Sequence, residues 1–154
     1  MRLLLQRVSE ARVVVDGIVV GEIGAGLLVL VGLGAGDTEK MFSAALEKVL
    51  NLRIFPDENG QMNRSVADVG GGVLAVSQFT LYADARKGRR PSYTDAMPPA
   101  AAKDLYETFV EHLRAAHTAG PVATGIFAAD MKVHLVNDGP VTIWLDGGQM
   151  GWKA

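Results

Sequence analysis

The feature that most restricts the possible folds is the unbroken apolar run Leu27-Leu28-Val29-Leu30-Val31, which has a glycine at each end. A strand with one face in water alternates apolar and polar residues, whereas this run is apolar at every position. We therefore expect a central strand that is buried on both faces.

Two segments have the periodicity of long helices. The first runs from Asp37 or Thr38, either of which can cap a helix, to about Asn51. The second begins at Pro98-Pro99, where a missing N–H does no harm, and stops before Gly120-Pro121. The wide apolar stripe of the first helix must face a sheet. The apolar rows are Met41, Ala45, Val49 and Phe42, Leu46, Leu50 in the first helix, and Ala101, Leu105, Phe109, Leu113 in the second.

Further strands are predicted from apolar runs and turn residues. Asp16-Gly17 and Asn59-Gly60 are hairpin turns, because glycine tolerates the positive φ that such a turn needs. Asp138-Gly139-Pro140 is predicted as a third turn. The strands cover residues 13–15, 18–20, 52–55, 73–79, 131–136 and 141–145. Strand pairs that alternate with two long helices predict one α/β domain over residues 1–154, with mixed, largely antiparallel sheets.

Composition and charge exclude several classes of protein. The chain has no cysteine, so thiol nucleophiles, disulfides and cysteine-ligated metals are excluded. Its net charge of −2 argues against a protein that coats nucleic acid, but permits contact with one exposed end of an RNA. His112 and His117, five apart on one predicted helix, do not share a face, and His134 points away from Val133 and Leu135. We therefore predict no metal site and no cofactor, with His112 and His117 facing solvent.

The start of the chain does not resemble a secretion signal. It reaches Arg2 and Arg7 too early for a signal-peptide core. No stretch approaches the roughly 20 apolar residues that span a bilayer as a helix. We expect a soluble, cytoplasmic protein.

Polar residues cluster where one predicted strand ends. Ser77, Gln78 and Thr80 surround Phe79, and strand ends often hold site residues because the sheet fixes them while solvent reaches them. No base accompanies the hydroxyls in sequence, so catalysis here would use backbone amides, hydroxyls and the substrate itself. The alternative is a strand that leaves the core with Gln78 and Thr80 facing water, and the residues alone do not separate the two.

Two further segments each have two interpretations. Arg86-Lys87-Gly88-Arg89-Arg90 is either a solvated loop or a phosphate-binding patch, and the patch gains weight only because the rest of the chain is acidic. Gly139-Pro140 is either an ordinary turn or a cis peptide whose two carbonyls point the same way, as a rigid wall without a side chain. On physical grounds alone the ordinary turn is favoured.

Taken together, these stretches resemble the D-aminoacyl-tRNA deacylase family. The first signature is Ser77-Gln78-Phe79-Thr80, which continues into the basic run, and the second is Asn137-Asp138-Gly139-Pro140-Val141-Thr142. The similarity extends from Gln6 to Leu145. Phe79 and the Gly-Pro pair favour the standard bacterial and eukaryotic type over a metazoan sister family, which lacks that Phe and has a Thr-Pro pair.

The resemblance implies a homodimer of compact, barrel-like subunits with two helices, in which Gly139-Pro140, in cis, reaches into the partner's site. At Ile126 and Ala128 the chain departs from the family, which often has Arg and Gly there. The implied site residues are Ser77, Gln78, Phe79 and Thr80 around the scissile ester, Phe127 and Met131 at the adenine, Ala102, Asn137, Gly139 and Pro140 beside them, and Arg86, Lys87, Arg89 and Arg90 on tRNA phosphates.

The implied activity is hydrolysis of the ester between a D-amino acid, or glycine, and the 3′-terminal ribose of tRNA, with L-aminoacyl esters rejected by the Gly-Pro wall. The amide of Phe79 or Thr80 would bind the oxyanion, and the ribose 2′-hydroxyl would orient the water. Attack by the Thr80 hydroxyl ranks lower for lack of a base. Two other classes stay open: a non-catalytic module that binds RNA 3′ ends, and a general esterase, for which the chain offers no activated nucleophile.

Overall fold

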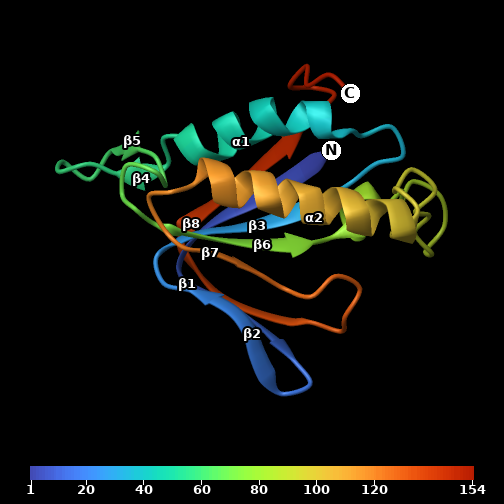
Figure 1. The fold of residues 1–154 in the computed structure, drawn as a ribbon, viewed down its shortest axis with the longest axis horizontal. Coiled ribbons are helices and arrows are strands. Elements are labelled where there is room, and N and C mark those ends of the chain that lie inside the picture. Colours follow the sequence, from blue (N-terminus) through green and yellow to red (C-terminus); the bar gives the residue numbers. More distant parts are fainter.

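A sheet of six strands, curled on itself, forms the centre of the computed structural model, which describes residues 1–154 (Figure 1). Two long helices, α1 (Phe42–Asn51) and α2 (Pro99–Ala116), cover one face of this sheet. No helix is long and apolar enough to cross a membrane. The strands of the sheet are β1 (Arg2–Val15), β2 (Ile18–Ile23), β3 (Gly26–Gly32), β6 (Gly72–Ser77), β7 (Val122–Thr124) and β8 (Lys132–Asp146), while β4 (Phe55–Pro56) and β5 (Met62–Arg64) form a separate hairpin.

The long strand β1 organises the sheet. It pairs antiparallel with β8 over almost its whole length, with β3 along its first half and with β2 near its end. Strand β6 lies between β3 and β7 and is parallel to both. The sheet curls until β7 approaches β2, and a Cβ on Gly21 would lie 2.2 Å from the carbonyl oxygen of Thr124, so the approach requires glycine. The predicted α/β fold, with a mixed, largely antiparallel, barrel-like sheet and two helices, is confirmed.

The core lies on both sides of β3, as the apolar run predicts. Leu27, Val29 and Val31 pack in the cluster beneath the helices. Leu28 faces the opposite way, into the smaller cluster inside the curled sheet, and Leu30 packs against that cluster. Every residue of the run is buried except Leu30, which is half-buried. This double coverage fixes the register of β3, because a shift by one residue would exchange its two faces.

The helices form where they are predicted, with differences at their edges. Helix α1 ends at Asn51 as expected, but neither Asp37 nor Thr38 caps it, because a 3₁₀ turn, η1 (Glu39–Met41), precedes it. The Asp37 carboxylate instead accepts hydrogen bonds from the Gly34 amide at 2.6 Å and from the Tyr82 hydroxyl at 3.2 Å. All six residues of the predicted stripe on this helix are buried, namely Met41, Phe42, Ala45, Leu46, Val49 and Leu50.

Helix α2 begins with Pro99 in its first turn, as expected. The predicted row is wrong at its start, since Ala101 is exposed. A step of four residues turns the helix by about 40° beyond a full circle, so a row of three such steps drifts off the buried face. The residues that face the sheet are Ala102, Tyr106, Phe109, Val110 and Leu113.

The predicted turns at Asp16-Gly17 and Asn59-Gly60 are confirmed. Asp16 and Gly17 both have positive φ, at 50° and 79°, and join β1 to β2. Gly60 has φ of 75° in the loop between β4 and β5. Two strands are shorter than predicted. Residues 52–54 are not in a strand, and β4 starts only at Phe55. Strand β6 ends at Ser77, where the chain then enters a 3₁₀ turn, η2 (Phe79–Tyr82).

The prediction of a chain reversal at Asp138-Gly139-Pro140 is wrong. Strand β8 continues through this segment and stays antiparallel to β1 on both sides of it. Val8 lies opposite Asn137 and Gln6 lies opposite Thr142, so two steps along β1 match five along β8. The additional residues form a bulge, and its Gly139-Pro140 peptide bond is cis.

Candidate active site

A cavity of about 730 Å³ opens at the end of β6. Four segments that are far apart in sequence meet there: the end of β3, the end of β6, the first half of α2 with the loop before it, and the connection between β7 and β8. Six of the predicted site residues line this cavity: Ser77, Gln78, Phe79, Ala102, Phe127 and Met131. Most of the remaining lining is apolar, as is typical of a small-molecule site with a few placed polar groups.

The end of β6 sets the positions of the polar groups. The Gln78 amide donates to the Val31 carbonyl at 2.8 Å, which extends the pairing of β6 with β3 by one residue. Turn η2 then brings the Gln78 side chain to Thr80, whose Oγ1 accepts a hydrogen bond of 2.5 Å from Nε2. Because Thr80 is the acceptor in this contact, its own hydroxyl proton is free to be donated to a ligand.

The mouth of the cavity is aromatic. Phe79 has 57% of its surface exposed and meets Tyr93 edge to face, with ring centroids 5.0 Å apart. Tyr93 also lines the cavity. The pair leaves two aromatic rings at the entrance, where a planar base or ring can stack.

Tyr106 forms part of the buried wall and was missed by sequence reasoning. Its hydroxyl donates to the Ala75 carbonyl at 2.9 Å, and its ring lies 5.9 Å from that of Phe127. Burial raises the pKa of the Tyr106 hydroxyl above its ordinary value. The available signal was a tyrosine among the apolar positions of a helix, where a buried hydroxyl needs a partner.

No side-chain base contacts the hydroxyls of Ser77 or Thr80. His134 is exposed on β8, and His112 is partly exposed and pairs with Glu39 at 3.0 Å. The prediction that His117 faces solvent is wrong: it is buried at the end of α2, where Nε2 lies 2.8 Å from the Gly71 carbonyl oxygen. At the end of β6 the site therefore offers uncharged donors and acceptors, and the one charged residue of the lining, Asp130, pairs with Lys132 at 2.9 Å.

The connection before β8 contains an unusual backbone position. Ala128, which lines the cavity, has a φ of 61°. This left-handed conformation suits glycine, the residue that the family often has at this position. Ile126, where the family often has arginine, is 47% exposed. The departures leave Phe127 and Met131 in place on the cavity wall.

The other predicted residues lie outside this cavity. Asn137 closes the bulge of β8: its Oδ1 accepts from the Val141 amide at 2.8 Å and its Nδ2 donates to the Thr142 hydroxyl at 2.9 Å. Gly139 and Pro140 are exposed at the top of the bulge. Within one chain, the second signature thus builds a protruding feature that is separate from the cavity.

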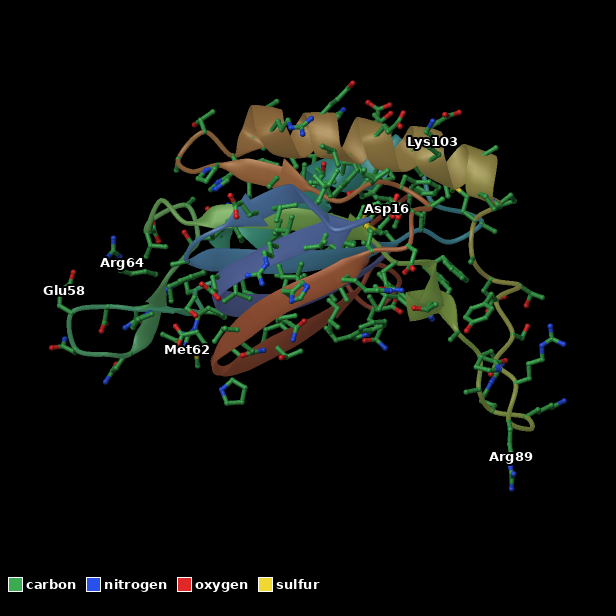
Figure 2. The ribbon with its side chains drawn as sticks, turned by 90° about the horizontal axis from the view of Figure 1, so that it is seen from below. Asp16, Glu58, Met62, Arg64, Arg89 and Lys103 are labelled. Atoms are coloured by element: carbon green, nitrogen blue, oxygen red, sulfur yellow. The ribbon has the colours of Figure 1, made fainter.

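The basic run forms a projecting loop. Figure 2 shows Arg89 at its tip, at the opposite end of the molecule from Glu58 and Arg64. Arg86 is held by Asp84 through hydrogen bonds of 2.8 and 2.6 Å, and this pairing lowers the pKa of the Asp84 carboxyl. The remaining cations, Lys87, Arg89 and Arg90, are exposed and form no ion pair.

Comparison with known proteins identifies the family. The family model for D-Tyr-tRNA(Tyr) deacylase matches residues 4–146. A D-aminoacyl-tRNA deacylase of Thermomicrobium roseum is 59% identical, with 97% of this chain and 96% of the relative covered. The corresponding protein of Geobacter metallireducens is 60% identical, with 95% of both chains covered.

Two solved structures share the fold of this chain. A protein named c-Myc DNA Unwinding Element Binding Protein has 42% identity and a TM-score of 0.90, with 95% of this chain and 98% of that one covered. A eukaryotic protein described as a probable D-amino acid tRNA deacylase shares the fold at 20% identity, with a TM-score of 0.81 and 94% and 97% of the two chains covered. The family match and the identities together show that this chain belongs to the D-aminoacyl-tRNA deacylase family.

Proposed function

We propose that this protein hydrolyses the ester between a D-amino acid, or glycine, and the 3′-terminal ribose of tRNA, in the cytoplasm. The observation that carries the proposal is the position of Ser77, Gln78 and Phe79, from a family signature, on an apolar cavity, with the exposed Thr80 hydrogen-bonded to Gln78 beside it. Its volume of about 730 Å³ lies within the range of ligand pockets. The mostly apolar lining, in which Asp130 is the one charged residue, suits a nucleoside with an attached aminoacyl group. The D-aminoacyl-tRNA deacylases that match the chain support this substrate.

The mechanism that fits this site uses backbone and substrate groups. Phe79 and Thr80 begin turn η2, and the first amides of a helical turn have no acceptor within the turn. Either amide can donate to the oxyanion of the tetrahedral intermediate, a contact typically worth about 3–4 kcal/mol of transition-state stabilisation. The 2′-hydroxyl of the terminal ribose then orients the attacking water. The Thr80 hydroxyl, with its proton free, helps to hold the ester.

Chiral selection follows if Gly139 and Pro140 of a second subunit close the cavity. Both residues are exposed on a bulge that projects from the chain's own sheet, outside its own cavity. Arg7 and Asn137 hold the bulge by hydrogen bonds. A wall of backbone carbonyls would exclude an L side chain at the α-carbon, while a D side chain points outward and glycine has nothing to exclude. The active unit is accordingly a homodimer.

Single-turnover rates on matched tRNAs test the proposal. D-alanyl and glycyl esters should be cleaved, and the L-alanyl ester should be slower by several powers of ten, where each factor of ten corresponds to about 1.4 kcal/mol. Rapid L-alanyl cleavage would refute exclusion and point to a pocket that grips the D side chain.

The dimer needs its own test. Light scattering during dilution should show activity falling together with the dimer fraction, because each site would lose the partner's wall. A fully active monomer would contradict the proposal that Gly139 and Pro140 of one subunit close the site of the other.

A non-catalytic module that binds RNA 3′ ends is the second candidate. The name of one relative at 42% identity, c-Myc DNA Unwinding Element Binding Protein, favours nucleic-acid binding. This candidate predicts tight binding of D-alanyl-tRNA with no release of the amino acid. A general esterase is not supported, because no base contacts Ser77 or Thr80.

A further inference from the structure

We propose that Arg2 is a positioning residue for this reaction: its guanidinium fixes turn η2 and thereby the amides of Phe79 and Thr80. The inference rests on the proposed function, since it assigns a role in that site. Arg2 does not line the cavity and would not touch the substrate. Its effect is transmitted through the turn that it holds.

The guanidinium makes four contacts at once, of which the longest is to the Trp144 ring, 5.8 Å from its centroid. Nη1 donates to the Leu81 carbonyl, inside η2, at 3.0 Å. Nε donates to Asp146 Oδ2, at the end of β8, at 3.0 Å. The flat face of the group lies over the ring of Tyr82, with the central carbon 4.4 Å from the ring centroid. Arg2 therefore joins the turn to the edge of the sheet.

The turn also rests on the end of β3 and the residues that follow it. A Cβ on Gly34 would lie 2.6 Å from the Tyr82 ring, and one on Gly32 would lie 2.9 Å from the Leu81 Cβ. Tyr82 thus packs against both the Arg2 guanidinium and the bare backbone of Gly34. Its hydroxyl donates to Asp37, which fixes the far end of the ring.

The turn has little stability of its own. The Leu81 amide donates to the Gln78 carbonyl at 3.3 Å, and the Ala83 amide to the Thr80 carbonyl at 3.0 Å. A short 3₁₀ turn with such bonds is a weak structure. The orientation of the Phe79 and Thr80 amides therefore depends on the contacts from outside, and of these only Arg2 binds a backbone carbonyl of the turn through a side chain.

Substitution of Arg2 by lysine or by methionine separates the effect of its charge from the effects of its stacking and its hydrogen bonds. Arg2→Lys keeps the charge beside Asp146 but cannot stack on Tyr82 and reach Leu81 together. Arg2→Met keeps the length and removes every hydrogen bond. Arg64→Met is the matched control, because Arg64 also donates to a backbone carbonyl, that of Asp68 at 3.0 Å, and lies at the far end of the molecule (Figure 2).

Single-turnover hydrolysis of D-alanyl-tRNA and glycyl-tRNA gives the main measurement. We expect kcat to fall about ten- to a hundredfold in Arg2→Met. The factor should be the same for both esters, because a misplaced oxyanion donor stabilises the transition state of either ester less well. KM should stay within about threefold, since the cavity is unchanged. Arg2→Lys should fall in between, and Arg64→Met should match the wild type.

A second measurement does not depend on activity. In ¹⁵N relaxation spectra, the amides of Phe79 and Thr80 should become more mobile in both Arg2 variants, while those of β3 stay rigid. If Arg2→Met does not fold, the same rates and spectra are compared between the wild type, Arg2→Lys and Asp146→Asn. Wild-type kcat in Arg2→Lys, or an unchanged turn in the spectra, would overturn the proposal. A wild-type protein that cleaves neither ester would refute the proposed function instead, and the spectra would still decide whether Arg2 orders the turn.

Discussion

Arg7 donates a hydrogen bond of 2.8 Å from Nε to the carbonyl oxygen of Asp138, the residue before Gly139-Pro140. Its Nη1 donates at 2.6 Å to the Ile54 carbonyl, so a mostly buried guanidinium ties the bulge of β8 to the segment after α1. The bulge is therefore held by the charged Arg7 guanidinium as well as by Asn137.

Replacing Arg7 by Met should loosen the bulge and weaken chiral selection. Charge-assisted hydrogen bonds contribute about 1.5–3 kcal/mol each, so we also expect a lower free energy of unfolding in urea. The ratio of D-alanyl to L-alanyl cleavage is the main measurement. Arg12→Met is the control, because Arg12 is exposed and forms no ion pair. An unchanged D-to-L ratio in Arg7→Met would show that the bulge does not depend on this contact.

Thr80→Ala should retain measurable turnover if its hydroxyl only places the ester. Loss of a true nucleophile lowers kcat by several powers of ten, whereas loss of one neutral hydrogen bond lowers it far less. Single-turnover rates of Thr80→Ala and Thr80→Ser make the comparison, since serine keeps the hydroxyl. A Thr80→Ala protein that binds D-alanyl-tRNA but never cleaves it would favour direct attack by Thr80.

The exposed cations of the basic loop should raise the affinity for tRNA without changing the ratio of D-ester to L-ester cleavage. Each of Arg89→Gln and Arg90→Gln should lower the slope of log affinity against log salt by about 1, because each removes one phosphate contact. Arg86→Gln should change it less, since Asp84 already holds that charge. Filter binding at several salt concentrations measures the slopes. Slopes identical to that of the wild type in all variants would show that the loop is a solvated surface that does not contact tRNA phosphates.

Tyr106 should make the protein less stable at high pH. Burial raises the pKa of its hydroxyl in the folded state, whereas an unfolded tyrosine ionises near 10. The neutral Tyr106 hydroxyl therefore contributes fully to the free energy of unfolding below about pH 10. Above that pH the contribution falls by about 1.4 kcal/mol for each pH unit, until the folded-state pKa is reached. Urea unfolding between pH 9 and 11 should show a smaller decline in Tyr106→Phe. Because burial also raises the pKa of Tyr82, a double variant with Tyr82→Phe should flatten the curve further.

Ala128→Gly should stabilise the protein. Ala128 has a φ of 61°, a left-handed conformation that is strained for any residue with a Cβ. We expect a gain of about 0.5–1 kcal/mol in the free energy of unfolding, measured in urea. Ala129→Gly is the control, because Ala129 has no positive φ, and it should lower stability through the greater freedom of the unfolded chain. A loss of stability in Ala128→Gly would contradict the strain argument.

Much of this fold was predictable because its signals are local. The run from Leu27 to Val31 is apolar at every position, and only burial on both faces satisfies it. The Asp16-Gly17 turn and the stripe of α1 likewise depend on neighbours within a few residues. The family was predicted for the same reason, because each signature is a contiguous string of residues, and the family match confirms it.

What the sequence by itself determined is therefore the two helices, the buried strand β3, the hairpin turns, the mixed fold and the family. Only the tertiary structure decided that β8 passes Gly139-Pro140 without reversing, because the long β1 offers it a partner on both sides. The structure also buried His117 and placed Arg2 over Tyr82. The physical reason is common to all three: each depends on contacts between residues that are distant in the chain, and no periodicity within a segment records which distant segment it will meet.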